Sequence, residues 1–199
     1  PPMNRTKISF TIIFVLISSF NLLIHAQDKK EISLLASEIL KVYSANRGLV
    51  VTCENIPLAI ELAKISELHC YANSDTQESV DLNRKLIEAA NLTALKIRVE
   101  KGPLETLAYP NCVANLIIST SNITPEKLKE FTRVLRPEGY LILITNKETI
   151  APIGFNDAKA FFSQNSSGNW GDPQKLDNHY YLKRNKIPGA ADWSHYFRD

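Results

Sequence analysis

Polar side chains that could bind a ligand follow four short apolar runs of this sequence. Glu54 follows the first run, Asp75 the second and Glu100 the third. A carboxylate there can accept hydrogen bonds from hydroxyl or amine groups, although an exposed loop carboxylate is the commoner role and Asp75 is also a candidate helix cap. After the fourth run, the segment 119–122 (STSN) contains no general base. None of these residues alone is evidence of catalysis.

The cysteines and histidines do not form a recognisable metal motif. Cys53, Cys70 and Cys112 are too few and too widely spaced for a disulfide scaffold or a zinc knuckle, and no two histidines have metal-ligand spacing. Cys53 and Cys70 close neighbouring apolar runs. They could form a disulfide in an oxidising compartment or remain as buried thiols.

Apolar runs that alternate with helical segments position these residues. Continuous apolar stretches predict strands at 49–53, 68–72, 95–99, 113–119 and 140–144. Three-to-four spacing of apolar residues predicts helices at 31–46, 57–66, from the cap candidates 74–76 to about 90, and 124–135. This alternation predicts an α/β fold with a Rossmann-like, doubly wound and mostly parallel sheet over residues 31–150. Cys53, Asn73 and Ser119 are expected near its carboxyl edge, where such sheets bind ligands.

The remainder of the chain is less regular. Residues 151–178 are rich in Gly, Pro, Asn and Ser, so 151–186 is predicted to be a linker, in which 179–183 could add an edge strand. Residues 187–199 contain three aromatic side chains. Because aromatic side chains bury large areas, we expect this segment to begin a further domain of a longer protein.

The amino-terminal segment has the pattern of a secretory signal. Arg5 and Lys7 precede an apolar run of 17 residues, and Ala26 stands before a polar stretch. We expect cleavage after Ala26 and a secreted or periplasmic protein. The alternative is an uncleaved membrane anchor, because 17 residues is near the lower limit for spanning a bilayer.

The charge balance does not favour nucleic acid as a partner. The formal net charge is +2, and without Arg5 and Lys7 there are 21 basic residues against 21 acidic ones. With 199 residues, of which 44% are hydrophobic, the chain has the composition of one globular domain. The predicted helix 124–135 and the residue after it carry a basic side, interpreted as a solvated face: Lys127, Lys129, Arg133 and Arg136.

A longer motif provides a family resemblance. Residues 131–144 (FTRVLRPEGYLILI) resemble the helix, turn and fifth strand of class I S-adenosylmethionine-dependent methyltransferases, and with 115–118 (NLII) they resemble the type 11 group. The order and spacing of elements agree over about residues 34–146. In the turn, Gly139 is expected to supply the backbone freedom with which the chain re-enters the sheet.

The resemblance implies that S-adenosylmethionine (SAM) binds at the carboxyl ends of the first strands. Cys53 and Glu54 would then lie at the first turn, Asp75 would hold the ribose hydroxyls, and Glu100 or Glu105 would accept the amino hydrogens of the adenine. Segment 119–122 would face a small-molecule methyl acceptor that the sequence does not identify.

The turn itself departs from the family pattern. The family has a glycine-rich turn after the first strand, whereas 52–57 (TCENIP) contains no glycine. Side chains there narrow the approach of a ligand to the backbone, and Pro57 removes a donor. SAM is therefore expected to bind weakly or not at all.

The last residues carry a second resemblance. Residues 187–199 (IPGAADWSHYFRD) resemble the segment that opens a pyrroloquinoline-quinone-type β-propeller in large secreted bacterial proteins. This resemblance implies a β-propeller of the same parent chain as a partner on the carboxyl-terminal side.

Two function hypotheses follow. The domain is either a SAM-dependent methyltransferase acting on a small molecule, or a catalytically inactive structural or interaction module beside the propeller. The secretory signal and the turn without glycine favour the second, because SAM is made and used inside cells.

The amino-terminal pattern gives the first prediction. Residues 1–26 should be missing from the exported protein, because Ala26 ends the apolar part of a signal and polar residues follow. Mass spectrometry of the secreted product measures the new amino terminus. An intact segment retained in the membrane fraction would instead establish an anchor.

Overall fold

A computed structural model describes residues 29–53, 55–103, 105–120, 123–144, 160–164, 169–176 and 179–186. The predicted signal, the propeller-like tail and Glu54 lie outside these residues. Within the described part of the chain, no helix is long and apolar enough to cross a membrane.

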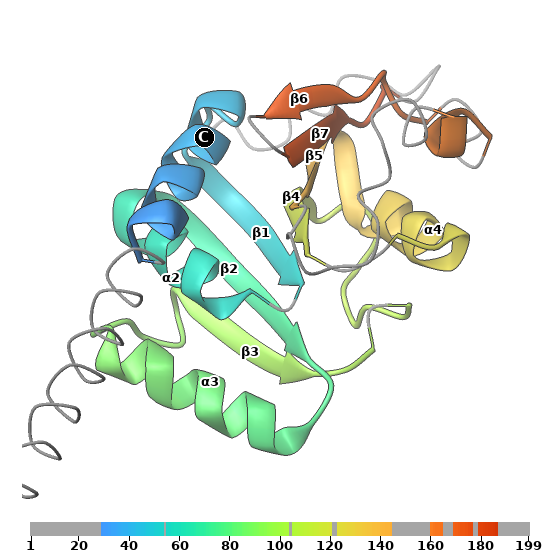
Figure 1. Cartoon of the computed structure of the whole chain (residues 1–199). Coiled ribbons are helices and arrows are strands. Elements are labelled where there is room, and N and C mark those ends of the chain that lie inside the picture. Colours follow the sequence, from blue (N-terminus) through green and yellow to red (C-terminus); the bar gives the residue numbers. More distant parts are fainter. Residues whose placement is uncertain are drawn as a thin grey trace, which may run out of the picture.

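The fold is built on one seven-stranded sheet with strand order β3-β2-β1-β4-β5-β7-β6 (Figure 1). Its first five members are parallel, and β7 is antiparallel to both of its neighbours. The predicted mixed α/β class with a mostly parallel sheet is therefore confirmed. The strands are β1 (Arg47–Cys53), β2 (Glu67–Ser74), β3 (Ile97–Lys101), β4 (Ala114–Ser119), β5 (Leu135–Leu143), β6 (Gln174–Leu176) and β7 (His179–Lys183).

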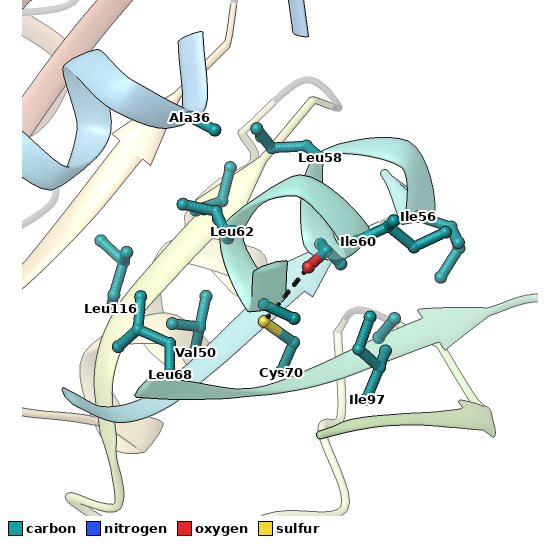
Figure 2. Packing of buried hydrophobic residues seen from close by; sticks show 14 of the residues in the cluster. Ala36, Val50, Ile56, Leu58, Ile60, Leu62, Leu68, Cys70, Ile97 and Leu116 are labelled. Carbon is teal, nitrogen blue, oxygen red and sulfur yellow. Dashed lines mark hydrogen bonds between the residues drawn. The ribbon is translucent and has the colours of Figure 1, made fainter. Parts of the chain in front are cut away.

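Helices cover both faces of the sheet, as continuously apolar strands require. The first helix (29–42), α2 (Ile56–Ile65) and α3 (Gln77–Ala89) pack on one face, where Val50 belongs to their core cluster (Figure 2). Helix α4 (Pro125–Val134) packs on the other face, where Val51 belongs to the second cluster. Neighbouring residues of β1 thus serve opposite cores, because side chains alternate along a strand.

The helix starts follow from local sequence. The side chains of Asn55, Thr76 and Thr124 accept hydrogen bonds from backbone N–H groups in the first turns of α2, α3 and α4. Proline at the first or second helical position of α2 and α4 fits because these N–H groups have no partner within a helix. Thr76 is the cap of α3, so Asp75 does not have that role.

Several boundaries differ from the sequence prediction. The first helix ends at residue 42 instead of 46, and β1 begins at Arg47 instead of residue 49. Strand β3 begins at Ile97 because a turn closed by the carbonyl of Thr93 precedes it, which leaves Leu95 83% exposed.

The predicted edge strand is also placed differently. Strand β7 lies between β5 and β6, so β6 forms the edge. Trp170 forms a bridge to Arg184 and is buried with α4, where its indole N–H donates to Thr132 Oγ1 at 3.1 Å. Residues 170–184, where described, therefore contribute β6, β7 and the Trp170 bridge to the sheet.

The backbone conformation of the connection between α4 and β5 differs from the predicted turn. Strand β5 begins at Leu135, directly after the helix, and Glu138 has the left-handed backbone conformation with φ of 62°. Gly139 has no positive φ, but a Cβ there would lie 2.9 Å from the carbonyl oxygens of both Arg136 and Asn115. Gly139 is needed for close approach to the backbone of β4, and Glu138 makes the unusual turn.

This packing predicts the effect of one methyl group. Gly139→Ala should lower the free energy of unfolding by about 1–3 kcal/mol, because the methyl group meets backbone atoms that cannot move aside cheaply. Gly171→Ala is the matched control, since its Cβ would have ordinary contacts at 3.4 Å and beyond. Chemical denaturation measures both. Equal losses in the two variants would contradict the role given to Gly139.

Candidate functional site at the carboxyl edge of the sheet

The parallel register brings the expected residues into one row. Cys53 lies opposite Asn73 of β2 and Ser119 of β4, and Asn73 lies opposite Glu100 of β3. This row is the carboxyl edge, and between β1 and β4 the strand order reverses, which is where open α/β sheets bind ligands. The predicted positions of Cys53, Asn73 and Ser119 are confirmed.

The turn from β1 into α2 leaves few donors for a ligand. Asn55 Oδ1 accepts from the N–H of Leu58 at 3.0 Å, and the Asn55 carbonyl accepts from the N–H of Ala59 at 3.1 Å. Pro57 has no N–H. Among the first four residues of α2, only Ile56 keeps a backbone N–H that could bind an anionic ligand group. Helix starts bind anions through such N–H groups, so the start of α2 is a weakened anion site.

Near the end of β2, two residues before the Asp75 that the family resemblance assigns to the ribose, lies the amide side chain of Asn73. Asn73 is 4% exposed, and its Oδ1 accepts a hydrogen bond from the hydroxyl of Tyr109 at 2.9 Å. Tyr109 is itself 8% exposed and its ring packs edge-to-face on Tyr71 at 5.5 Å. The Asn73 side chain, close to the predicted ribose position, is therefore neutral and bonded to the protein's own loop.

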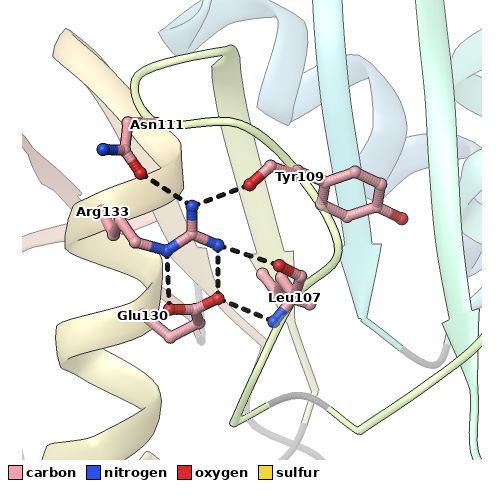
Figure 3. Close-up of polar contacts among 5 residues, drawn as sticks. All are labelled: Leu107, Tyr109, Asn111, Glu130 and Arg133. Atoms are coloured by element: carbon pink, nitrogen blue, oxygen red, sulfur yellow. Dashed lines mark hydrogen bonds and ion pairs between the residues drawn. The ribbon is translucent and has the colours of Figure 1, made fainter.

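That loop, residues 105–113, is held by α4 (Figure 3). The guanidinium of Arg133 donates to the carbonyls of Leu107 at 2.8 Å and Tyr109 at 2.7 Å, and to Asn111 Oδ1 at 2.8 Å. Glu130 accepts from Arg133 Nε at 2.9 Å and from the N–H of Leu107 at 2.7 Å. The hydrogen bond from Arg133 holds the pKa of Glu130 below its usual range, and burial opposes this shift.

We call this Arg133–Glu130 pair, with its bonds to the loop 105–113, the loop clamp. The sequence interpretation of Arg133 as part of a solvated face is wrong, because its donors are directed at loop carbonyls. The clamp fixes Tyr109 over Asn73, so the loop and the end of β2 form one bonded unit.

The other sequence-predicted residues are spread apart. Asp75 is exposed, one residue beyond the end of β2. Glu100 pairs with Arg98 of its own strand at 2.8 Å, and Glu105 pairs with Lys127 at 3.5 Å. Among the described carboxylates expected at the cofactor, Glu100 and Glu105 are thus bonded to neighbours and Asp75 is exposed, and the structure does not gather these three around one point.

Cys70 does not lie at a strand end. It is opposite Val50, three residues before the Asn73 row, and its thiol donates to the carbonyl of Ala59 at 3.6 Å under α2 (Figure 2). Burial raises its pKa to about 12 and it is a free thiol. The disulfide alternative with Cys53 is therefore wrong, and Cys70 is an unreactive core residue.

Within the described ranges, no three His, Cys, Asp or Glu side chains are grouped so that they could hold a metal ion. Sequence reasoning missed Tyr109, Glu130 and Arg133. Two sequence signals could have identified them: an aromatic residue in a polar loop, and an acidic and a basic residue three positions apart on a helix.

Comparison with solved structures agrees with the sheet order. A protein assigned as an S-adenosyl-L-methionine-dependent methyltransferase from Methanococcus maripaludis is 19% identical, with a TM-score of 0.59 over 80% of this chain and 87% of that one. A SAM-dependent methyltransferase from Aquifex aeolicus is 14% identical, with a TM-score of 0.58 over 74% and 87%. TrmN from Thermus thermophilus is 15% identical, with a TM-score of 0.55 over 76% and 48%.

The sequence matches no protein-family model, and the search of curated proteins finds no relative. At these identities the solved structures establish the fold, which is that of class I SAM-dependent methyltransferases.

The described residues do not fit the cofactor that this fold takes in its enzymes. At the start of α2, the backbone N–H of Leu58 is bonded to the capping side chain of Asn55. The side-chain oxygen of Asn73 already accepts a hydrogen bond from Tyr109. A ligand at this edge would have to break bonds that the protein makes with itself, and each buried group left unpaired costs about 1–3 kcal/mol.

The loop clamp gives the next prediction. Arg133→Ala should lower the free energy of unfolding by about 1–3 kcal/mol, because loop carbonyls and Glu130 lose their donors together. Arg98→Ala is the matched control, since its exposed pair with Glu100 should contribute roughly 0–1 kcal/mol. Chemical denaturation at pH 7 measures the free energy of unfolding of both variants. Equal losses would contradict the stabilising role given to the loop clamp.

The difference in unfolding free energy between wild type and Arg133→Ala should shrink as the pH falls. A carboxyl group whose pKa is lowered on folding stabilises the protein above its ordinary pKa and loses that effect as the pH falls through the folded value. The stability gap between wild type and Arg133→Ala should therefore be complete at neutral pH and narrow below the ordinary value of 4.5 for Glu130. A gap that widens in acid would contradict this account.

Proposed function

We propose that this chain is a non-catalytic module with the class I methyltransferase fold, acting in structure or interaction within a larger exported protein. The observation that carries the proposal is the hydrogen bond from Tyr109 to Asn73, which closes the carboxyl edge two residues before Asp75, the predicted ribose ligand. The closed start of α2 and the turn without glycine support it.

The second candidate is a SAM-dependent methyltransferase with an unidentified small-molecule acceptor. The strand order and the solved neighbours favour it, since they share the fold of such enzymes. SAM would then lie along the row of Cys53, Asn73 and Glu100, with Glu54 and Asp75 at its ends. The enzyme candidate requires the loop 105–113 to move, because Tyr109 covers Asn73.

The wider context is part of the same proposal. The secretory pattern of residues 1–26 supports export, with a membrane anchor as the alternative, and residues 187–199 support a following β-propeller as the partner. An exported domain would meet little SAM, which agrees with a site that no longer serves it.

Calorimetric titration with SAM separates the two candidates. Two unsatisfied groups at about 2 kcal/mol each weaken binding roughly a thousandfold. Micromolar affinity would thus become about millimolar, and we expect no saturable heat from the chain below that concentration.

The matched variants are Asp75→Ala and Asp81→Ala, which remove exposed carboxylates at the predicted ribose position and on α3. A low-micromolar dissociation constant that Asp75→Ala abolishes and Asp81→Ala preserves would establish the enzyme candidate. Tyr109→Phe adds a direct test, because it frees Asn73 Oδ1 and should strengthen any residual binding.

A further inference from the structure

A hollow of about 950 Å³ opens at the opposite, amino edge of the parallel strands. It lies where β1, β2, β4 and β5 begin and where the chain leaves the first helix, so it is separate from the row of Asn73. Its volume is within the range of small-molecule sites. We call it the amino-edge hollow; the residues used below are Tyr43, Arg47, Gly48, Asn115, Arg136 and Tyr140.

The floor of the amino-edge hollow is fixed by close contacts. Gly48 has φ of 122°, and a Cβ there would lie 2.5 Å from Asn115 Oδ1. That oxygen accepts from the N–H of Leu49 at 3.0 Å, while the hydroxyl of Tyr43 donates to the carbonyl of Arg47 at 2.6 Å. The hollow is therefore pre-formed, with its backbone held by hydrogen bonds across three elements.

Two guanidinium groups in this hollow are unpaired among the residues that the structure describes. Of the six arginines in the described ranges, Arg84 and Arg98 pair with carboxylates, Arg133 makes the loop clamp, and Arg184 is buried and donates to the carbonyl of Leu135. The side chains of Arg47 and Arg136 make no hydrogen bond or ion pair with any described residue. Both line the amino-edge hollow.

The two arginines line the same hollow as Tyr43. Burial raises the pKa of Tyr43, and the charges of Arg136 and Arg47 both oppose that rise, so both guanidinium groups act on the same hydroxyl. That hydroxyl is already bonded to Arg47 O. The guanidinium donors therefore remain available to a ligand while Tyr43 supports the floor.

One of the two carboxylates of the hollow is engaged elsewhere: Glu138 pairs with Lys183 and Lys186 at 3.5 and 3.7 Å. The other, Glu67, lies opposite Arg47 in the register of β1 and β2, so the lining has one carboxylate against the cations Arg47, Lys96 and Arg136. Lys96 adds a further cation and donates to the carbonyl of Ser66. The hollow therefore favours an anion, and Arg forks suit phosphate oxygens.

An aromatic wall stands beside the cations. The half-buried ring of Tyr140 lies between Tyr43 and Tyr181, with ring centroids 6.2 Å from each, and Lys183 Nζ lies 5.9 Å from the centre of the Tyr140 ring. A ligand held by the arginines would thus have an apolar surface next to its charged group.

We propose that the amino-edge hollow binds a small-molecule phosphate ester, with its phosphate held by Arg47 and Arg136 and its apolar part against Tyr140. This site lies at the other edge of the sheet from the SAM row and does not depend on whether SAM binds. It gives the module a ligand of its own.

Phenyl phosphate is the probe, titrated into the full chain at low salt and followed by calorimetry and by the backbone amide signals of Gly48 and Leu49. Saturable binding is expected. Arg47→Gln and Arg136→Gln should each weaken it about tenfold or more, because each removes charge-assisted hydrogen bonds. Arg98→Gln, an exposed arginine on the edge strand β3, should leave it unchanged.

Two further probes test the chemistry. Benzoate offers the same ring with a single charge, and inorganic phosphate offers the charge without the ring, so both should bind more weakly than phenyl phosphate. Benzoate binding as tightly would overturn the preference for phosphate. Equal binding of inorganic phosphate would mean an adventitious ion only.

The remaining outcomes also test the proposed site. Absence of saturation, or equal losses in the Arg47, Arg136 and Arg98 variants, would overturn the site. Thermal unfolding of each variant checks that it remains folded, which the exposure of Arg47 and Arg136 leads us to expect. Tyr109→Phe should not alter phenyl phosphate binding, so failure here and failure of the proposed function are distinguishable.

Discussion

Burial of β1 on both faces is the constraint on which the rest of the structure depends. Val50 and Val51 are adjacent and both fully buried, so one strand must be covered by helices from opposite sides. Neither face of such a strand is accessible to a ligand. Only the two edges of the parallel sheet remain for binding, and the chain treats them differently: its own loop covers the end of β2 at the carboxyl edge, while the amino edge is hollow.

Sequence periodicity predicted the elements that depend on local burial. The runs that became β1, β2 and β4 are continuously apolar, and the caps Thr76 and Thr124 mark their helices, so these features follow from neighbouring residues. The place of β7 between β5 and β6 does not, because strand order at that side depends on pairing between distant segments. At the α4–β5 corner the motif was correctly located, yet the roles of Glu138 and Gly139 required the approach of β4 to be known.

The candidate site divides in the same way. Parallel register follows from the fold, so the row of Cys53, Asn73 and Ser119 could be predicted. The bond from Tyr109 to Asn73 joins residues 36 positions apart through an irregular loop, and no periodic pattern reports such a contact. The amino-edge hollow is harder still to predict, because Arg47 and Arg136 line the same hollow only when β1 and β5 flank β4.

A domain that folds without a cofactor must satisfy its buried polar groups by itself. In an enzyme that takes its cofactor at this edge, ligand atoms can complete some of those bonds, and binding then adds to stability. Here Tyr109 completes the bond of Asn73, Asn83 donates to Ser74 at 2.9 Å, and Asn55 completes the start of α2. Each of these bonds stabilises the empty fold, and each raises the cost of admitting a ligand. The same contacts that stabilise the carboxyl edge alone therefore oppose a ligand there, and the proposal of a non-catalytic module rests on this physical argument, because a fold by itself does not fix a reaction.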